Sequence, residues 1–191
     1  MRYLIASILL FFTYTTLAQF KIEQYSVGEG LAQSQVYAMM EDSRGFIWMG
    51  TKGGGISKFD GKKFTNYSTK NGLVNNYVLA IYEHTDGNIW IGTYDGYSIY
   101  NGLGFESVRI NNKANLVVTD FVRVEDKVWI GTSKGIVILD NGKFTDWSAE
   151  NKLYKRHIFD LHVDEDNAVW ACSDDGMLRI KDGDIQQFGK D

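Results

Sequence analysis

The sequence has no proline and only one cysteine, Cys172, among its 191 residues. A single thiol cannot form a disulfide within the chain, so no internal covalent cross-link holds the fold together. No histidine lies beside Cys172, and we therefore expect a buried structural thiol rather than a nucleophile. Without proline, the 20 glycines together with Asn and Asp must supply the tight turns.

Positive charge is also scarce. The chain has 20 Lys and Arg residues against 24 Asp and Glu residues, which gives a formal net charge of −4. No run of basic residues occurs anywhere in the sequence. Because a protein that holds a phosphate backbone needs a positive field, we do not expect nucleic acid as a partner.

Metal-ligand patterns are missing too. His84, His157 and His162 are scattered, with no Cys or carboxylate set at the spacing of a zinc site. The segment 164–167 has the Asp-x-Asp spacing of a calcium loop, but it lacks the Gly and the distal Glu of that loop. We therefore expect neither a metal ion nor another cofactor.

Hydrophobic runs long enough to cross a bilayer do not occur. The strongest candidate, from Leu4 to Phe12, falls short of the roughly 20 residues that a membrane span needs. It follows the positive charge of Arg2 and is followed by a small residue, Ala18, a pattern typical of a secretory signal peptide. We predict that residues 1–18 are a signal peptide and that the protein is exported. An uncleaved anchor helix is the alternative.

What the sequence does contain is a repeat. The stretch 86–93, Asp-Gly-Asn-Ile-Trp-Ile-Gly-Thr, has close copies at 42–51, 125–132 and 166–173. A fixed period of about 40 residues is the signature of a stacked or radial repeat protein. The repeated tryptophans lie 42, 39 and 41 residues apart, at Trp48, Trp90, Trp129 and Trp170.

Each repeat offers four strand-like runs separated by turn residues. In the first repeat the runs are 35–41, 46–51, 55–59 and 63–67, with Asp60-Gly61 as a hairpin signal. Four antiparallel strands in about 40 residues describe one blade of a β-propeller. The predicted fold is therefore an all-β propeller with four blades present, at residues 30–71, 72–110, 111–150 and 151–191.

The segment before the first repeat resembles the end of a repeat. Phe20 to Ser26 is similar to residues 63–68, so we predict that residues 19–29 form an N-terminal strand that closes a blade. The fourth repeat already has a fourth strand of its own, at 184–188, which leaves the N-terminal strand without a partner. We therefore expect an incomplete ring and a longer parent protein. A complete four-bladed propeller is the alternative.

Together these motifs resemble a known family. Gly-Leu at 30–31 and 72–73, Ile-Trp-Ile-Gly-Thr, the Asp-Gly or Asn-Gly turn and a final Phe-x-x-Tyr are similar to the two-component regulator propeller repeat. The third repeat departs from the pattern, since Asn111 to Ala114 replaces Gly-Leu. The fourth departs at Trp170-Ala171-Cys172-Ser173. The first two repeats are the best matches.

The resemblance implies a function and a location. The family occurs in periplasmic sensor regions of hybrid two-component histidine kinases, especially those of glycan-degrading Bacteroidetes. It implies a periplasmic sensor segment without enzymatic activity of its own, an oligosaccharide as ligand and a parent protein that allows a homodimer. A membrane span and a cytoplasmic histidine kinase would follow beyond this sequence.

The repeated tryptophans are predicted to form the structural core. Burial of 150 to 250 Å² of ring at about 25 cal/mol per Å² gives a gross gain of about 4 to 6 kcal/mol, before the cost of ordering the side chain. The Gly after each Trp is expected to allow close packing of strands near the central axis.

Candidate ligand-binding residues come from two sets of loops. In a four-stranded blade, the loop after the fourth strand and the loop between the second and third strands emerge on the same face. Aromatic and amide side chains there would stack on sugar rings and bond to hydroxyl groups. The candidates are Ser34, Gln35, Asn75, Asn76, Tyr77, Arg156 and His157 from the first set, and Lys52, Tyr94, Asp95, Tyr97, Lys134 and Asp174 from the second.

Two other classes of function stay open at this point. An exported propeller enzyme of the lyase or glycosidase type is one, although the carboxylate pair Asp174 and Asp175 is adjacent in sequence and would diverge. Acid and base catalysis on a glycoside needs two carboxyl groups that converge across the substrate. A scaffold that binds another protein is the other class.

Overall fold

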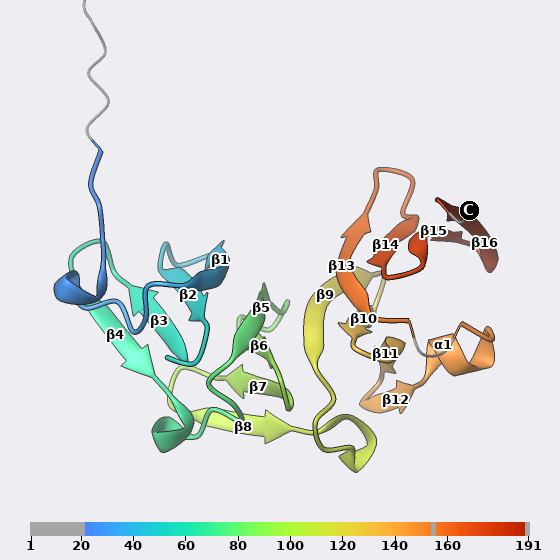
Figure 1. The fold of residues 1–191 in the computed structure, drawn as a ribbon. Coiled ribbons are helices and arrows are strands. Elements are labelled where there is room, and N and C mark those ends of the chain that lie inside the picture. The colour runs from blue at the N-terminus through green and yellow to red at the C-terminus, as the bar shows by residue number, and fades with distance from the viewer. Residues whose placement is uncertain (1–21, 154–155, 190–191) are drawn as a thin grey trace, which may run out of the picture.

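The computed structural model describes residues 22–153 and 156–189. It contains four antiparallel sheets of four strands each, and each sheet takes its strands from one repeat. The sheets follow one another around an arc, with the inner strands on the concave side and the outer strands on the periphery (Figure 1). The predicted propeller fold of four-stranded blades is confirmed. The predicted signal peptide lies outside the described residues.

The strands of each blade are joined in chain order, so neighbouring strands in sequence are neighbours in the sheet. Every strand falls within the predicted limits of its repeat. The strands are β1 Val36–Glu41, β2 Ile47–Thr51, β3 Ile56–Phe59 and β4 Phe64–Tyr67 in blade 1; β5 Val78–Glu83, β6 Ile89–Thr93, β7 Gly96–Tyr100 and β8 Phe105–Val108 in blade 2; β9 Val118–Val124, β10 Lys127–Thr132, β11 Gly135–Asp140 and β12 Lys143–Thr145 in blade 3; and β13 Ile158–Val163, β14 Val169–Ser173, β15 Gly176–Lys181 and β16 Asp184–Phe188 in blade 4.

Short helical turns occupy the connections before the blades. They are the 3₁₀ turns η1 Val27–Glu29, η2 Thr69–Asn71 and η3 Ile110–Asn112, and the single-turn helix α1 Trp147–Glu150. The fourth strand of blade 3 ends at Thr145, because the next residue, Asp146, accepts a hydrogen bond from the Ala149 N–H at 3.1 Å and so caps α1. Among the described residues, no helix has the length and apolar character of a membrane span.

The core lies between adjacent blades. Trp48 on β2 packs with Val78, Ile89 and Ile91 of blade 2, and Trp90 on β6 is equally buried against blade 3. Because each Trp faces the following blade, the repeat builds one interface after another. The prediction of a buried core is confirmed for Trp48 and Trp90. Trp129 and Trp170 are half-buried.

The glycine that follows each Trp allows the next blade to approach. A Cβ atom on Gly50 would lie 2.4 Å from Cγ1 of Val78, and one on Gly92 would lie 3.0 Å from Cγ1 of Val118. The same contact recurs at Gly131, where a Cβ would lie 3.1 Å from Cγ2 of Ile158. The predicted role of these glycines in close strand packing therefore agrees with the structure.

Cys172 occupies the position of these glycines in blade 4, and there the expectation of a buried thiol is wrong. The side chain of Cys172 is exposed. The three equivalent glycines are each covered by the inner strand of a following blade, whereas no following blade lies over β14 in the part of the chain that the structure describes.

The predicted N-terminal strand is also corrected. Residues 22–26 are not in a strand, and residues 27–29 form the 3₁₀ turn η1. A strand needs a ladder partner, and each of the four sheets is already filled by the four strands of its own repeat. The rest of the predicted segment, residues 19–21, lies outside the described residues.

Candidate functional site

The inner strands of the four blades share an irregularity. In each of them the pairing with the second strand shifts by one residue near the start, which is a β-bulge. A bulge leaves one residue out of the ladder and turns its side chain to a new direction. The residues that the bulges leave without a partner on the second strand are Tyr37, Leu79, Thr119 and Phe159.

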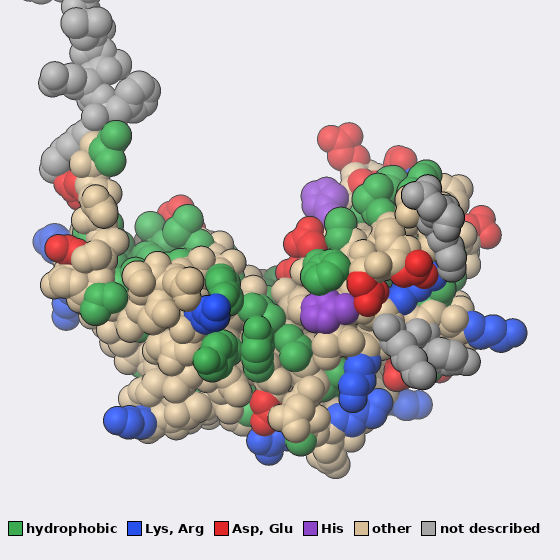
Figure 2. All heavy atoms as spheres, viewed as in Figure 1, with side chains coloured by type: hydrophobic (Ala, Val, Ile, Leu, Met, Phe, Trp, Pro, Cys, Tyr) green, Lys and Arg blue, Asp and Glu red, His purple; other side chains and the backbone are tan. Residues whose placement is uncertain are grey.

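These four residues line one cavity on the concave side of the arc. It has a volume of about 680 Å³, and Val117, His157, Tyr94 and Ser133 complete its lining. Figure 2 shows the hollow between the two limbs of the arc, with hydrophobic side chains along its walls. A cavity of this size is within the range of small-molecule sites. We call it the channel cavity.

The second-to-third loops bring further side chains to the mouth of the cavity. The Lys52 N–H donates to the Gln35 carbonyl at 3.0 Å, and the Tyr94 N–H donates to the Tyr77 carbonyl at 3.2 Å. Ser133 and Val117 form the same bond in blade 3, and Asp174 and His157 form it in blade 4, at 3.0 and 3.2 Å. Both sets of loops therefore lie on one face, as the sequence predicts.

Aromatic side chains dominate this face. The rings of Tyr77 and Tyr94 stack with their centroids 5.1 Å apart, and the ring of His157 lies 4.7 Å from that of Phe159. Tyr37, Tyr77, Tyr94 and Phe159 all stay substantially exposed. Flat, exposed rings with hydroxyl groups suit the faces and hydroxyls of a sugar ring.

Lys52 places a positive charge beside these aromatic side chains. Lys52 Nζ lies 5.9 Å from the centroid of the Tyr37 ring. A hydrogen bond with the Tyr37 hydroxyl, followed by the charges on Tyr37, Tyr77 and Tyr94, raises the pKa of Lys52. The ammonium group is therefore charged at neutral pH and is available to an anionic or hydroxyl-rich ligand.

Polar groups on the cavity wall are few. The Ser133 hydroxyl accepts a hydrogen bond from the Val117 N–H at 3.3 Å. The Thr119 hydroxyl is buried and has no hydrogen-bond partner among the described residues. Within the same residues, no group of three or more His, Cys, Asp or Glu side chains could hold a metal ion.

Beside the cavity, two carboxyl groups meet at the junction of blades 3 and 4. Asp120 accepts a hydrogen bond from the Leu161 N–H at 2.8 Å. Burial, together with the neighbouring carboxylate of Asp160, raises the pKa of Asp120 to about 6. Asp120 and Asp160 directly follow Thr119 and Phe159, which line the cavity. The sequence analysis did not single out this pair, because its members are 40 residues apart.

Some predicted site residues have structural roles instead. Tyr97 was expected in a loop, but it lies on β7 and is buried in the core, where desolvation strongly raises its pKa. Asp95 binds the Arg109 guanidinium at 2.7 Å and accepts from the Asn115 N–H at 2.7 Å. The hydrogen bond from Arg109 lowers the pKa of Asp95. These two residues hold the blade together rather than face the cavity.

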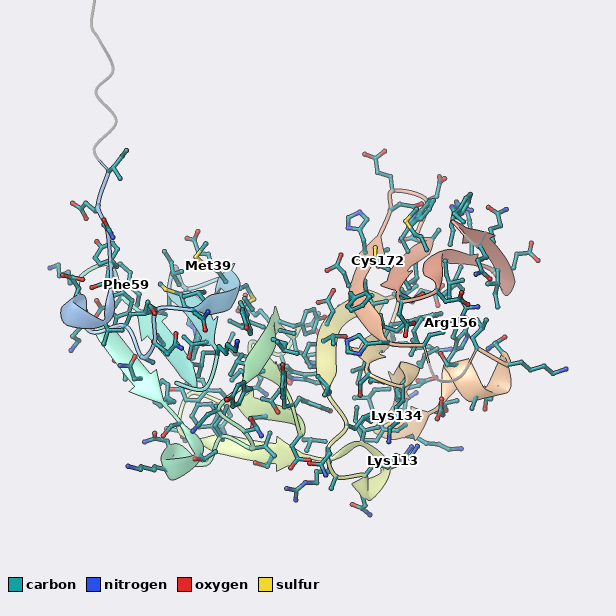
Figure 3. The ribbon with its side chains drawn as sticks, in the orientation of Figure 1. Met39, Phe59, Lys113, Lys134, Arg156 and Cys172 are labelled. Atoms are coloured by element: carbon teal, nitrogen blue, oxygen red, sulfur yellow. The ribbon has the colours of Figure 1, made fainter. Side chains whose placement is uncertain are left out.

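The remaining candidates lie around the cavity without lining it. Asn75 and Asn76 shape the connection to blade 2, since their side-chain oxygens accept from the backbone N–H groups of Tyr77 and Thr69. Arg156 forms an ion pair with Asp175 at 3.0 Å and lies beside blade 4 (Figure 3). Among the predicted residues, Tyr94 and His157 line the cavity. Gln35, Lys52, Tyr77 and Asp174 belong to the loops that are joined by the backbone hydrogen bonds given above, and Ser34 and Lys134 are also outside the lining.

The bulge residues are the part of the cavity that sequence reasoning missed. A strict alternation of side-chain directions along the inner strand does not show that these residues face the cavity, because the bulge interrupts the alternation. A signal was nevertheless present, since each bulge residue stands two positions after Gln35, Tyr77, Val117 or His157 in the aligned repeats. Tyr37, Leu79 and Phe159 lie 11 residues before the repeated Trp, and Thr119 lies 10 residues before it, because the first turn of the third repeat is one residue shorter.

Comparisons with known proteins agree with this architecture. Residues 30–53 and 72–95 match the family model described as two component regulator propeller. These matches cover the starts of blades 1 and 2, so the chain carries repeats of that type. No curated protein sequence matches the chain.

Solved structures share the fold. The extracellular domain of BT4673 from B. thetaiotaomicron, described as a hybrid two-component system, matches with a TM-score of 0.72 and 24% identity over 83% of this chain and 22% of that one. The corresponding domain of BT3049 from the same organism gives 0.60 and 22%, over 84% of this chain and 27% of that one. The chain thus spans about a quarter or less of these structures.

A propeller enzyme is also similar. Virginiamycin B lyase from Staphylococcus aureus matches with a TM-score of 0.69 and 17% identity, over 90% of this chain and 60% of that one. Its structure was determined with quinupristin. At such identities the likeness shows a common fold, and the roles of individual residues have to be argued from the cavity itself.

Proposed function

We propose that this chain, which carries two-component regulator propeller repeats, is a ligand-sensing β-propeller of an exported two-component signalling protein. Its repeats match that family in blades 1 and 2. Its fold is similar to extracellular domains described as parts of hybrid two-component systems. The proposal places the chain in the periplasm, with a histidine kinase in the parent protein and no catalytic activity in the four blades.

The observation that carries the proposal is the channel cavity. It is open to solvent and lined by residues at equivalent positions of all four blades, so a ligand there contacts every blade in the arc at once. Such a ligand stabilises one relative arrangement of the blades over others. A preference of this kind is the physical requirement for a sensor.

The ligand that we propose is an oligosaccharide derived from a glycan. Tyr37, Tyr94 and Phe159 offer exposed aromatic surface, and Ser133 offers a hydroxyl group. Sugars present both an apolar ring face and a rim of hydroxyls, and this lining complements both.

Isothermal titration calorimetry of the 191-residue chain against a panel of oligosaccharides tests this proposal. We expect binding by at least one glycan and a loss of about tenfold in affinity for Tyr94→Ala, which corresponds to the value of about 1.4 kcal/mol for one stacked ring. Phe188→Ala is the matched control, because Phe188 is an equally exposed ring on β16, away from the cavity. Absence of heat across a broad panel would count against a sugar sensor.

A propeller lyase is the second candidate, favoured by the similarity to virginiamycin B lyase. His157 lines the cavity and the pair Asp120 and Asp160 lies beside it, so these titratable groups could act as acid or base. Mass spectrometry of the same oligosaccharides after incubation separates the two functions. Intact ligands support a sensor, and cleaved products that disappear in His157→Ala or Asp120→Asn support an enzyme.

A further inference from the structure

In two of the four blades, the ring of the repeated Trp has a cation of the chain itself beside it. In blade 1, Lys58 Nζ lies 5.2 Å from the centroid of the Trp48 ring and 6.0 Å from that of Tyr100 in blade 2. In blade 4, Arg179 Cζ lies 5.7 Å from the centroid of the Trp170 ring. The face of an indole ring attracts a cation, so both contacts are favourable.

Blade 3 lacks such a cation. Trp129 lies opposite Ile138 in the sheet, whereas its equivalents in blades 1 and 4 lie opposite Lys58 and Arg179. Its ring packs instead against that of Trp147, the first residue of α1, with the centroids 5.3 Å apart. Both tryptophans are only half-buried. Blade 3 therefore presents two indole rings without the cation that the other two blades provide.

Both tryptophans line a second cavity, between blades 3 and 4, with a volume of about 250 Å³. In blade 2, Tyr100 lies opposite Phe105, and Tyr100 packs on the Trp of blade 1 with the ring centroids 5.3 Å apart. Ile180 and Ile185 take these two positions in blade 4. Because isoleucine is smaller than an aromatic residue, a hollow stays open beside the two indole rings. We call it the tryptophan cavity.

The tryptophan cavity is separate from the channel cavity and has an acidic rim. It is bordered by the first hairpin turns of blades 3 and 4 and the third turn of blade 4, at the strand ends opposite to the loops of the channel cavity. Its charged lining residues are Glu125, Asp166, Asp182, Lys127 and Lys181. Lys127 pairs with Asp140 at 3.5 Å, and Asp166 pairs with Arg179 at 3.7 Å. Two carboxylates then remain against one lysine, so the lining favours a cation.

Glu125 has a backbone conformation that an L-residue rarely adopts. Its φ is 55°, and the residues with positive φ in the first hairpin turns of blades 1 and 2 are Gly45 and Gly87. Glycine takes this conformation without steric cost, whereas glutamate does not. Asn167, at the equivalent turn of blade 4, also has positive φ and also lines the cavity. Strain of this kind is found at binding sites, where the side chain serves the site.

We propose that the tryptophan cavity binds a small organic cation with an alkylated ammonium head group. The head group lies against the rings of Trp129 and Trp147, as the ammonium group of Lys58 lies beside the Trp of blade 1, and Glu125 and Asp182 face its charge. The cavity is smaller than the roughly 300 to 1,000 Å³ of sites for drug-sized ligands, so it suits a head group rather than an oligosaccharide. This site does not depend on the function proposed for the channel cavity.

Chloride salts of choline and of sodium, at equal ionic strength, provide the probe and its reference. The chain has five tryptophans, and NMR spectra of the indole N–H groups follow each of them. Choline should shift the signals of Trp129 and Trp147 and leave those of Trp48 and Trp90 unchanged. The neutral isostere of choline, with a tert-butyl group in place of the trimethylammonium group, should bind at least tenfold more weakly. Equal binding of the isostere, or no shift at Trp129 and Trp147, would overturn the proposal.

Two variants locate the site. Ile138→Lys supplies the ammonium group that blade 1 has at this position and should abolish choline binding. Glu125→Gly removes a carboxylate and the strained φ, so it should raise the melting temperature while weakening choline binding about threefold.

Glu41→Gln is the matched control, because it removes an exposed carboxylate of blade 1, and it should leave choline binding unchanged. If Ile138→Lys does not fold, Glu125→Gly decides the case, because it alters only an exposed turn. Undiminished choline binding in folded Ile138→Lys or in Glu125→Gly would overturn the proposal. An equal loss in Glu41→Gln and Glu125→Gly would do so too, because it would mean that net charge rather than the cavity attracts choline.

Discussion

The hairpin turn between the first two strands of a blade determines whether the indole N–H of the repeated Trp has an acceptor. In blade 1, Asp42 accepts from Trp48 Nε1 at 2.8 Å, and its other oxygen accepts from the N–H groups of Phe46 and Arg44 at 2.9 and 3.0 Å. Burial raises the pKa of the Asp42 carboxyl, but these hydrogen bonds outweigh it, so the pKa is lowered. The ionised form of Asp42 thus holds both the turn and the core.

Blade 2 has a different residue at this position. His84 stacks on Trp90 with the ring centroids 4.9 Å apart, and the buried Nε1 of Trp90 has no hydrogen-bond partner among the described residues. An unsatisfied buried donor costs stability, whereas a bond to a carboxylate contributes it. The two turns therefore provide a matched pair for experiment.

We predict that Asp42→Ala lowers the free energy of unfolding by about 2 to 3 kcal/mol, because it leaves Trp48 Nε1 and two backbone N–H groups without acceptors. His84→Ala should cost less, about 1 kcal/mol, because it removes a ring stack and a partly exposed contact with Asp86 rather than the acceptor of a buried donor. Urea denaturation followed by tryptophan fluorescence measures both values. Equal losses in the two variants would contradict the role assigned to the Asp42 carboxylate.

The pair Asp120 and Asp160 predicts a pH dependence. Since the folded-state pKa of Asp120 is raised to about 6, above its unfolded value near 3.8, the protonated carboxyl stabilises the fold. This contribution is fully present below about pH 4 and is lost as the pH rises through about 6. We expect Asp160→Asn, which removes the neighbouring carboxylate and leaves both acceptors of Asp120 in place, to raise the melting temperature at pH 7 and to leave it nearly unchanged at pH 3.5, where Asp120 is already protonated.

Thermal denaturation monitored by circular dichroism at both pH values tests this. Asp126→Asn is a suitable control, since Asp126 is a highly exposed turn residue that forms an ion pair with Arg123 within its own hairpin. A gain in Asp160→Asn that is the same at pH 3.5 and pH 7 would show that the carboxyl proton of Asp120 is not the cause.

At the residue scale, the sequence predicts the role of a residue correctly where the same residue type recurs at the same position of several repeats. The burial of Trp48 and Trp90 and the packing of Gly50 follow from a periodic pattern, because the same interface needs the same residues. The prediction of a buried thiol at Cys172 is wrong, because the interface that would bury this position is not formed in the described chain. Tyr37 and Phe159 were missed, because a bulge changes their direction without altering the residue pattern.

At the scale of elements, the close approach of successive blades depends on the glycine of the second strand. Gly50 faces a β-branched side chain, Val78, whose Cγ1 would lie 2.4 Å from an added Cβ. At Gly131 the nearest atoms are the Thr119 hydroxyl oxygen, at 3.0 Å, and Cγ2 of Ile158, at 3.1 Å, so an added Cβ meets no contact as short as the one at Gly50. The same substitution should therefore have different costs at the two interfaces.

We predict that Gly50→Ala destabilises the protein by about 1 to 3 kcal/mol through overpacking, and that Gly131→Ala costs less than 1 kcal/mol. The double variant Gly50→Ala with Val78→Ala should recover part of the loss of the first, because it removes the methyl group that clashes. Chemical denaturation of the four proteins gives the coupling energy. Additive effects of Gly50→Ala and Val78→Ala would contradict a direct clash.

Strand limits were predictable because each strand is bounded by turn residues of a defined kind. Asp60-Gly61, Asn101-Gly102 and Asn141-Gly142 place the hairpins, and glycines with positive φ occupy the second position of each turn. A strand was wrongly predicted for the N-terminal segment, because its sequence resembles that of an outer strand. Strand formation also needs a neighbouring strand as a hydrogen-bond partner.

At the scale of the whole molecule, stability is distributed unevenly along the arc. Blade 2 is covered by neighbours on both sides, and all five residues of β6 are buried. Blade 1 exposes Val36 and Met39, and four of the five residues of β16 in blade 4 are exposed. In a linear array of repeats, stability is approximately a sum of the stabilities of the units and of their nearest-neighbour interfaces.

This distribution predicts the order of local opening. We expect native-state hydrogen exchange to show the highest protection in β6, because its amides exchange only when both flanking interfaces open, and the lowest in β16, whose outer edge and face are in water. A ligand in the channel cavity contacts β1, β5, β9 and β13 and should slow exchange in all four inner strands together, while leaving β16 unchanged. Uniform protection across the four blades would mean that the arc opens as a single cooperative unit, and protection confined to one inner strand would mean that the ligand does not bridge the blades.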